Sequence, residues 1–181
     1  MMMRKTGFAA TLFAAALIPA GSALAHTGTI EAAGISAGIG HPLTGYDHMI
    51  AMAAVGLWAW RQGGKAMWLL PMAFLTAMAI GMLVGFTAGS SQIAEFGVGA
   101  SVFVFVLMAL KRRPIPLHAA SALAAGFALF HGYAHGAIVT DSASALPFVA
   151  GALVGTGMAH ALGMTVGAIF QRRRLHARST R

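Results

Sequence analysis

The stretch His41-Pro42-Leu43-Thr44-Gly45-Tyr46-Asp47-His48 leads directly into the apolar run MIAMAAVGLWAW, residues 49–60. It places two imidazoles and a carboxylate at the start of a segment long enough to cross a bilayer. An ionisable side chain inside a membrane span costs about 3 kcal/mol or more, so such groups face a partner, the bundle interior or water. We therefore expect these three side chains to form a buried polar site.

Pro42 suits the first turn of a helix, where its missing N–H has no intrahelical acceptor, and so we predict a helix that begins near His41. At about 100° per residue, His41 and His48 would lie almost on one line of that helix, with Asp47 about a quarter-turn away. The three side chains could then converge on one metal ion. The structural alternative is that Asp47 pairs with a neighbouring histidine or caps the start of the helix.

The composition of the whole chain is that of a membrane protein. Of 181 residues, 58% are hydrophobic and 9% are charged, and the mean hydropathy is +0.76, whereas soluble domains have roughly a quarter of charged residues. The net charge of +8 comes from short basic clusters at the ends of apolar segments, which is typical of membrane orientation rather than of nucleic-acid binding. There is no cysteine, so metal ligands must be imidazole, carboxylate, backbone or thioether groups.

The chain divides into a leader, a membrane domain and a tail. Residues 1–25 combine Arg4 and Lys5, an apolar run and the sequence Ala23-Leu24-Ala25, which predicts a signal peptide that is cleaved to leave His26 as the mature N-terminus. The free amine and ring of His26 could then chelate a metal. Residues 26–171 would form a single transmembrane helical domain, after an extracytoplasmic lead-in over residues 26–40, and residues 172–181 a basic cytoplasmic tail.

The predicted fold is an all-α, polytopic membrane bundle of five helices, over about 42–60, 66–87, 92–110, 116–139 and 145–170. The connections that contain Arg61 and Lys65, or Lys111 and the arginines beside it, alternate with connections that lack Lys and Arg. This alternation predicts an N-out, C-in orientation. Pairs of glycines four residues apart recur along the helices and indicate close helix packing.

Three more histidines lie within the predicted spans. His131 and His135 are one turn apart, on one face of the fourth span, which is a common spacing for two metal ligands. They would lie roughly 22–28 Å from the inner end, at a depth compatible with His41 and His48. His160 would lie about 22 Å down the fifth span and could be a second station on a path inward. The structural alternatives are a hydrogen-bonded histidine pair and a packed core histidine.

The block HPLTGYDH, residues 41–48, together with MAAVGLWA, residues 52–59, resembles the signature of the HupE/UreJ family. The leader before His26 and the block HGYAHG, residues 131–136, are also similar to that family. The resemblance implies a bacterial inner-membrane permease for nickel, with cobalt as the alternative cargo, that serves hydrogenase or urease maturation proteins. It also implies that His41, Asp47 and His48 are needed for metal movement, with His131 and His135 next, and no organic cofactor.

Three other functions remain open at this point. A haem-binding membrane anchor would use two histidines on different helices. An intramembrane hydrolase would need a metal-bound water and a base, but the chain has no His-Glu-x-x-His or Gly-x-Ser-x-Gly sequence, so we do not expect an enzyme. A membrane metal-binding accessory protein would bind the same ion without transporting it.

Overall fold

The computed structural model describes residues 34–111, 113–139 and 142–179, and every regular element in these ranges is an α-helix. The predicted signal peptide and His26 lie outside the described residues. The helices are α2 (Ile35–Thr44), α3 (Tyr46–Gln62), α4 (Ala66–Ala88), α5 (Gln92–Leu110), α6 (Leu117–Ala137) and α7 (Ser142–Ser179). The all-α fold predicted from the sequence is therefore confirmed.

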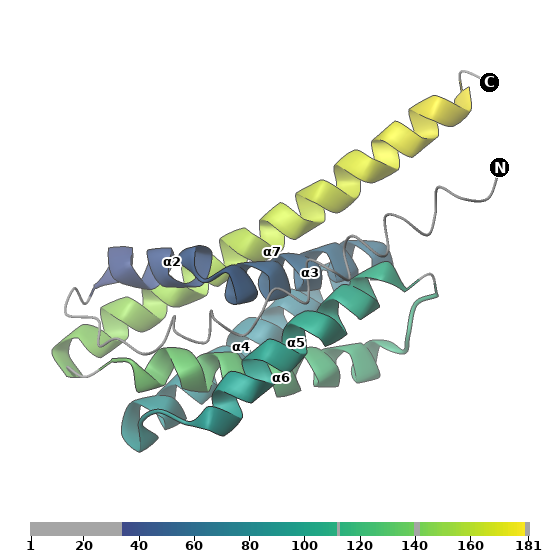
Figure 1. Ribbon diagram of the computed structural model, residues 1–181. Coiled ribbons are helices and arrows are strands. Elements are labelled where there is room, and N and C mark those ends of the chain that lie inside the picture. The colour runs from purple at the N-terminus through teal and green to yellow at the C-terminus, as the bar shows by residue number, and fades with distance from the viewer. Residues whose placement is uncertain (1–33, 112, 140–141, 180–181) are drawn as a thin grey trace.

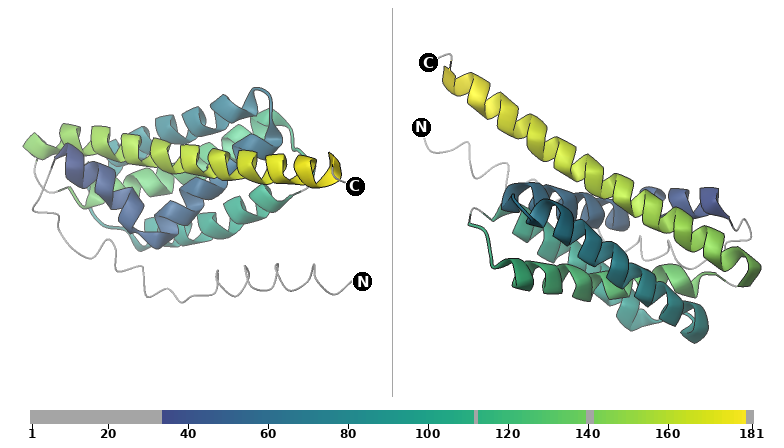
Figure 2. Two further views of the ribbon diagram at one scale, coloured as in Figure 1. Left: turned by 90° about the horizontal axis from the view of Figure 1, so that it is seen from above. Right: turned by 180° about the vertical axis from the view of Figure 1, so that it is seen from behind.

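The helices form two layers (Figures 1 and 2). Helices α2 and α3 run end to end and pack against α7, while α4 packs closely against α6, with α5 beside them. Contacts of α3 with α4 and α5 join the two layers. The C-terminal part of α7 projects beyond the other helices.

The prediction of one helix that begins near His41 is wrong. The chain is already helical from Ile35, within the predicted lead-in, and Pro42 lies inside the last turn of α2 rather than in the first turn of a helix. Gly45 then adopts an extended conformation, with φ −76° and ψ 111°, and α3 begins at Tyr46. Because the chain breaks at Gly45, His41 and His48 come from two helices and not from one line of a single helix.

The other predicted spans agree with the observed helices at most ends. Helices α4, α5 and α6 begin and end within two residues of the predicted limits. Helix α7 is longer than predicted, because helical structure continues through the first eight residues of the predicted basic tail, to Ser179. The limits of apolar segments are thus a good guide to helix ends in this chain, except where a helix continues into water.

Close helix crossings in the bundle depend on glycine. A Cβ atom placed at Gly132 or Gly136 of α6 would overlap the carbonyl oxygen of Met78 or Met82 of α4. In the same way, Cβ atoms at Gly81 and Gly85, on α4, would overlap carbonyl oxygens of α6. The glycine pairs of these two helices therefore pack against each other within one chain, which allows the two backbones to approach closely.

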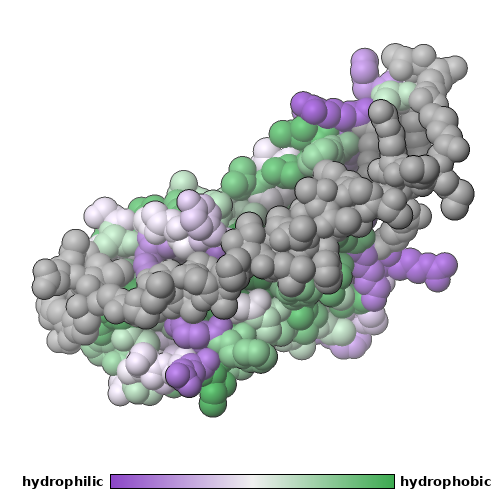
Figure 3. Space-filling view, in the orientation of Figure 1, coloured by the Kyte–Doolittle hydropathy of each residue, from purple (hydrophilic) through white to green (hydrophobic). Residues whose placement is uncertain are grey.

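The flank of the bundle is apolar, as expected for a surface that contacts lipid. Large exposed hydrophobic side chains include Trp68 at 71%, Leu83 at 69% and Phe96 at 79% exposure. In Figure 3, hydrophobic side chains are visible along the flank, and hydrophilic ones lie toward both ends of the bundle and along the projecting part of α7. An apolar flank with polar ends is the pattern of a membrane protein.

Three helices among the described residues are long and apolar enough to cross a membrane, namely Ala66–Ala88, Gln92–Leu110 and the Ala145–Arg173 part of α7. Helix α3, with 17 residues, is shorter than these three helices. Helix α6 has 21 residues, or about 31 Å of helix, but it contains three histidines that lower its hydropathy. The chain is a membrane protein, and five spans with an N-out, C-in orientation stay a prediction.

Candidate metal centre

Four histidines from three helices meet inside the bundle: His41 of α2, His48 of α3, and His131 and His135 of α6. We call these four residues the histidine cluster. The ring centroids of His48 lie 4.8 Å from His131 and 4.7 Å from His135, and those of His41 and His135 lie 4.9 Å apart. His41 and His48 are farther apart, at 6.3 Å. The convergence of these rings was predicted from their sequence positions, although through a different helix geometry.

The sequence His131-Gly132-Tyr133-Ala134-His135-Gly136 explains how α6 directs its two histidines. Each histidine is followed by a glycine, and at about 100° per residue the glycine pair lies about a quarter-turn around the helix from the histidine pair. The glycine pair is packed against the backbone of α4. This contact fixes the rotation of α6 and turns both imidazoles into the bundle interior, where each is fully buried.

The break at Gly45 gives Asp47 its role at the start of α3. The Asp47 carboxylate accepts a hydrogen bond from the backbone N–H of His48 at 2.8 Å, and its Oδ1 atom lies 3.0 Å from Nδ1 of the same histidine. A carboxylate is favoured in the first turn of a helix by the helix dipole. A Cβ atom at Gly45 would lie 3.2 Å from Asp47 Oδ1, so glycine leaves room for this arrangement.

The contact with Asp47 defines which nitrogen of His48 can bind a metal. An ionised carboxylate only accepts hydrogen bonds, so Nδ1 of His48 donates, and Nε2 is the nitrogen that carries the lone pair in the neutral form of the ring. Carboxylates that orient a metal-binding imidazole in this way are common outside the first coordination sphere of metal sites. The structural alternative weighed for Asp47, pairing with a neighbouring histidine at a helix start, is thus observed, and direct ligation by Asp47 stays a prediction.

Ser101 of α5 orients His131 in a similar way. The Ser101 hydroxyl donates to the carbonyl oxygen of Val98 at 2.6 Å, and its oxygen lies 2.7 Å from Nε2 of His131. Because the single hydroxyl hydrogen is used on Val98, the imidazole must donate from Nε2 and keep its lone pair on Nδ1. The rings of His48 and His131 are adjacent, and each has one nitrogen whose hydrogen bond is defined by a partner side chain.

The cluster is closely packed, and three of its four histidines are buried. His48 is 1% exposed, and His131 and His135 are 0% exposed. Their rings meet edge to face, at interplanar angles of 69° and 85° with His48. In this packed arrangement, no three His, Cys, Asp or Glu side chains of the described residues are positioned to hold a metal ion together. The imidazoles would have to turn toward a common centre to bind one.

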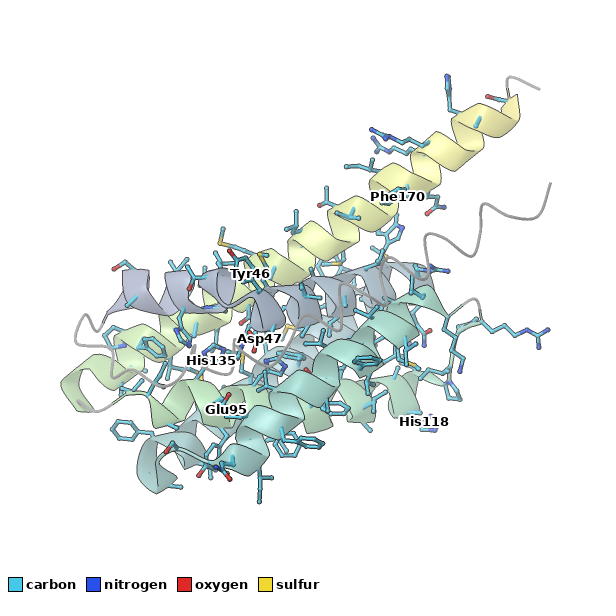
Figure 4. The ribbon with its side chains drawn as sticks, in the orientation of Figure 1. Tyr46, Asp47, Glu95, His118, His135 and Phe170 are labelled. Atoms are coloured by element: carbon cyan, nitrogen blue, oxygen red, sulfur yellow. The ribbon has the colours of Figure 1, made fainter. Side chains whose placement is uncertain are left out.

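The remaining predicted site residues lie elsewhere. His160 of α7 is 1% exposed, and its ring packs on Phe74 at 5.1 Å rather than on the cluster. The part of the chain that the structure describes does not include His26. Figure 4 shows Asp47 and His135 close together inside the bundle, with Glu95 also in that half and His118 at the opposite end.

Two residues near the cluster were missed by the sequence analysis. Ser101 is a hydroxyl residue in the apolar run SVFVFVLMAL, residues 101–110, and a buried polar side chain at membrane depth is a signal that could have identified it. Phe74, which contacts His131 at 5.4 Å, lies in an apolar helix and gave no such signal.

Comparison with known proteins gives two similarities that cover most of the chain. The family model described as HupE / UreJ protein matches residues 14–180. A relative named Protein HupE, from Rhizobium leguminosarum bv. viciae, is 36% identical over 159 residues, which is 88% of this chain and 82% of the relative. No solved structure matches the chain significantly.

Proposed function

The chain belongs to the HupE/UreJ family, and from this premise we propose that it is a permease that takes up a divalent transition metal, with nickel as the main cargo and cobalt as the alternative. The metal would enter at the histidine cluster from the periplasmic side of the bacterial inner membrane. Hydrogenase or urease maturation proteins would receive it on the cytoplasmic side.

The observation that supports this proposal is the meeting of four imidazoles from three helices at one place in an apolar bundle, three of them buried and His41 partly exposed. Such a site is costly in a membrane unless it serves a function. Neutral imidazole is a good ligand for nickel, and equally for cobalt, copper and zinc. The cluster therefore supports a transition metal as the cargo, while the choice of nickel is based on the family resemblance.

The packing of the cluster suits a transported ion better than a permanent one. The rings now contact each other edge to face, so binding a metal must replace these contacts and turn the side chains. This rearrangement opposes binding and lowers the affinity. A transport site needs a moderate affinity, because the ion must be bound strongly enough to enter and weakly enough to leave.

The same packing does not favour the haem-binding alternative. A haem held between two histidines places the porphyrin plane between the two rings. Three ring pairs in the cluster lie in direct contact, with centroids 4.7–4.9 Å apart. These pairs leave no space for a porphyrin between their two rings.

The experiment that tests the proposal is uptake of radioactive nickel in cells that lack their own nickel importer. The cells would express the wild type, His48→Ala or His118→Ala at matched membrane levels. His118 is the control because it is an exposed imidazole of α6 at the end away from the cluster. We expect uptake by the wild type and His118→Ala, and background uptake by His48→Ala, and competition with cobalt and zinc ranks the metals.

Equal uptake by wild type and His48→Ala would show that the cluster is not on the path of the metal. If a well-expressed wild type gave no uptake, the permease proposal would be wrong. The metal content and visible absorption of the purified protein would then distinguish an accessory metal-binding protein from a haem protein.

A further inference from the structure

Phe74 of α4 lies between the histidine cluster and His160. It is 0% exposed, and its ring centroid lies 5.4 Å from that of His131 and 5.1 Å from that of His160. Among the ring contacts of the described residues, Phe74 is the only aromatic side chain that touches both histidines. It therefore separates the cluster from the next imidazole along the bundle.

His160 is an unusual core residue. It is 1% exposed, and neither of its ring nitrogens has a hydrogen-bond partner among the described residues. Leaving a buried polar group without a partner costs about 1–3 kcal/mol, and histidines that serve only packing are normally paired. Its position at the closest approach of α3 and α7, where its carbonyl oxygen packs on Gly56, keeps it deep in the protein.

A buried hydroxyl and a thioether lie one helical turn from His160 and from Phe74, in the direction of the histidine cluster. Thr156 lies one turn before His160 on α7, is fully buried, and donates a hydrogen bond to the sulfur of Met78 at 3.5 Å. Met78 in turn lies one turn after Phe74 on α4. The Met78 carbonyl oxygen packs on Gly132, beside His131, so this thioether and this hydroxyl lie on the cluster side of the Phe74 ring.

Phe74 also belongs to an apolar layer below the cluster. Its ring contacts Phe105 at 6.0 Å, and Phe105 stacks near Trp58 at 6.4 Å. Phe105 lies one turn along α5 from Ser101, which contacts the cluster. All three aromatic side chains are nearly or fully buried. Of these three side chains, Phe74 is the one whose ring contacts both His131 and His160 among the described residues, and an apolar ring between two imidazoles resists the passage of a charged or hydrated ion.

We propose that Phe74 is a gate between two metal stations, the histidine cluster and His160. This inference is built on the proposed function and adds a step to it. With the ring in its observed position, the path from His131 to His160 is closed. A change of the Phe74 rotamer would remove the ring from between the two imidazoles and let the ion pass from one to the other.

The test measures how fast His160 reacts with diethyl pyrocarbonate, a small reagent that modifies neutral imidazole, in the purified full-length protein by mass spectrometry. In the wild type we expect His160 to react much more slowly than the partly exposed His41. In Phe74→Ala we expect the rate at His160 to rise at least tenfold, and added nickel to suppress that reaction. Phe74→Leu, which keeps an apolar side chain, should give an intermediate rate.

The matched control is Phe105→Ala. Phe105 is buried to the same extent and contacts Phe74, but its ring contacts among the described residues include no histidine. We expect the rate at His160 to stay within twofold of wild type in this variant. The thermal stability of each variant identifies any that is misfolded, and Phe74→Leu replaces Phe74→Ala if the latter does not fold.

Two results would overturn the gate. One is equal labelling of His160 in the variants of Phe74 and Phe105, which would reflect general loosening of the core. The other is fast labelling of His160 in the wild type. Failure of nickel to protect His160 in Phe74→Ala would remove His160 as a station. These measurements do not use transport, so a wild type without nickel uptake would refute the proposed function separately.

Discussion

At the scale of single residues, two histidines of the cluster each have an orienting partner. Asp47 fixes the tautomer of His48 from the same helix, and Ser101 fixes that of His131 from α5. Both contacts leave a lone pair on a defined nitrogen. Partners of this kind typically change metal affinity about 10–100-fold when they are removed.

We therefore predict that Ser101→Ala weakens nickel binding about 10–100-fold, because His131 loses the contact that sets its tautomer and ring orientation. Isothermal titration calorimetry of the purified protein with nickel measures this change in affinity. Thr165→Ala is the control, since its hydroxyl also bonds to a backbone carbonyl, that of Ala161, but on an exposed part of α7. If both variants bound nickel as the wild type does, the role given to Ser101 would be wrong.

At the scale of helices, the glycine pairs determine where the histidines point. In α6 the glycines pack against α4 and the preceding histidines turn toward α2 and α3. Gly151 and Gly155 of α7 likewise pack against the backbone of α2. The recurring glycine spacing therefore serves crossings inside the chain, and it is the closeness of these crossings that brings the cluster together.

Gly132→Ala is predicted to destabilise the bundle by about 1–3 kcal/mol, since the added methyl group would overlap the backbone of α4, which cannot move aside as a side chain would. The control is Gly126→Ala in the same helix, where a Cβ atom meets nothing within 4 Å; it should be neutral or stabilising by up to about 1 kcal/mol. Thermal unfolding in detergent compares the two. Similar melting temperatures would argue against the close crossing of α4 and α6.

At the scale of the whole molecule, the polar groups are distributed between the two ends of the bundle. The basic connections between α3 and α4, and between α5 and α6, lie at the end from which α7 projects (Figure 1). The cluster lies away from that end, with Asp47 and His135 in the other half (Figure 4). Positive charge is favoured on the cytoplasmic side, so the cluster would be nearer the periplasm.

This orientation can be tested because the chain has no cysteine. We expect Ser90→Cys, in the exposed α4–α5 connection, to react with a membrane-impermeant maleimide added outside the inner membrane. Ser179→Cys, at the exposed end of α7, should react only after the membrane is permeabilised. The cysteine-free wild type gives the background. The opposite labelling pattern would place the histidine cluster on the cytoplasmic side.

The sequence by itself determined the fold class and most of the helices. Apolar segments of sufficient length predicted α4, α5 and α6 to within two residues, because a helix in lipid must satisfy its own backbone hydrogen bonds over the full span. Ionisable groups are costly to bury in such segments, and this cost predicted a common site for His41, Asp47, His48, His131 and His135.

The tertiary structure decided how those residues meet. The break at Gly45 divides the first predicted helix and joins His41 to His48 across two helices. The contacts of Ser101 with His131, and of Phe74 with both His131 and His160, connect residues 30–86 positions apart in the chain. Helical periodicity fixes which side chains share a face of one helix. Which faces meet depends on the close packing of glycine backbones, and this is a property of the folded bundle.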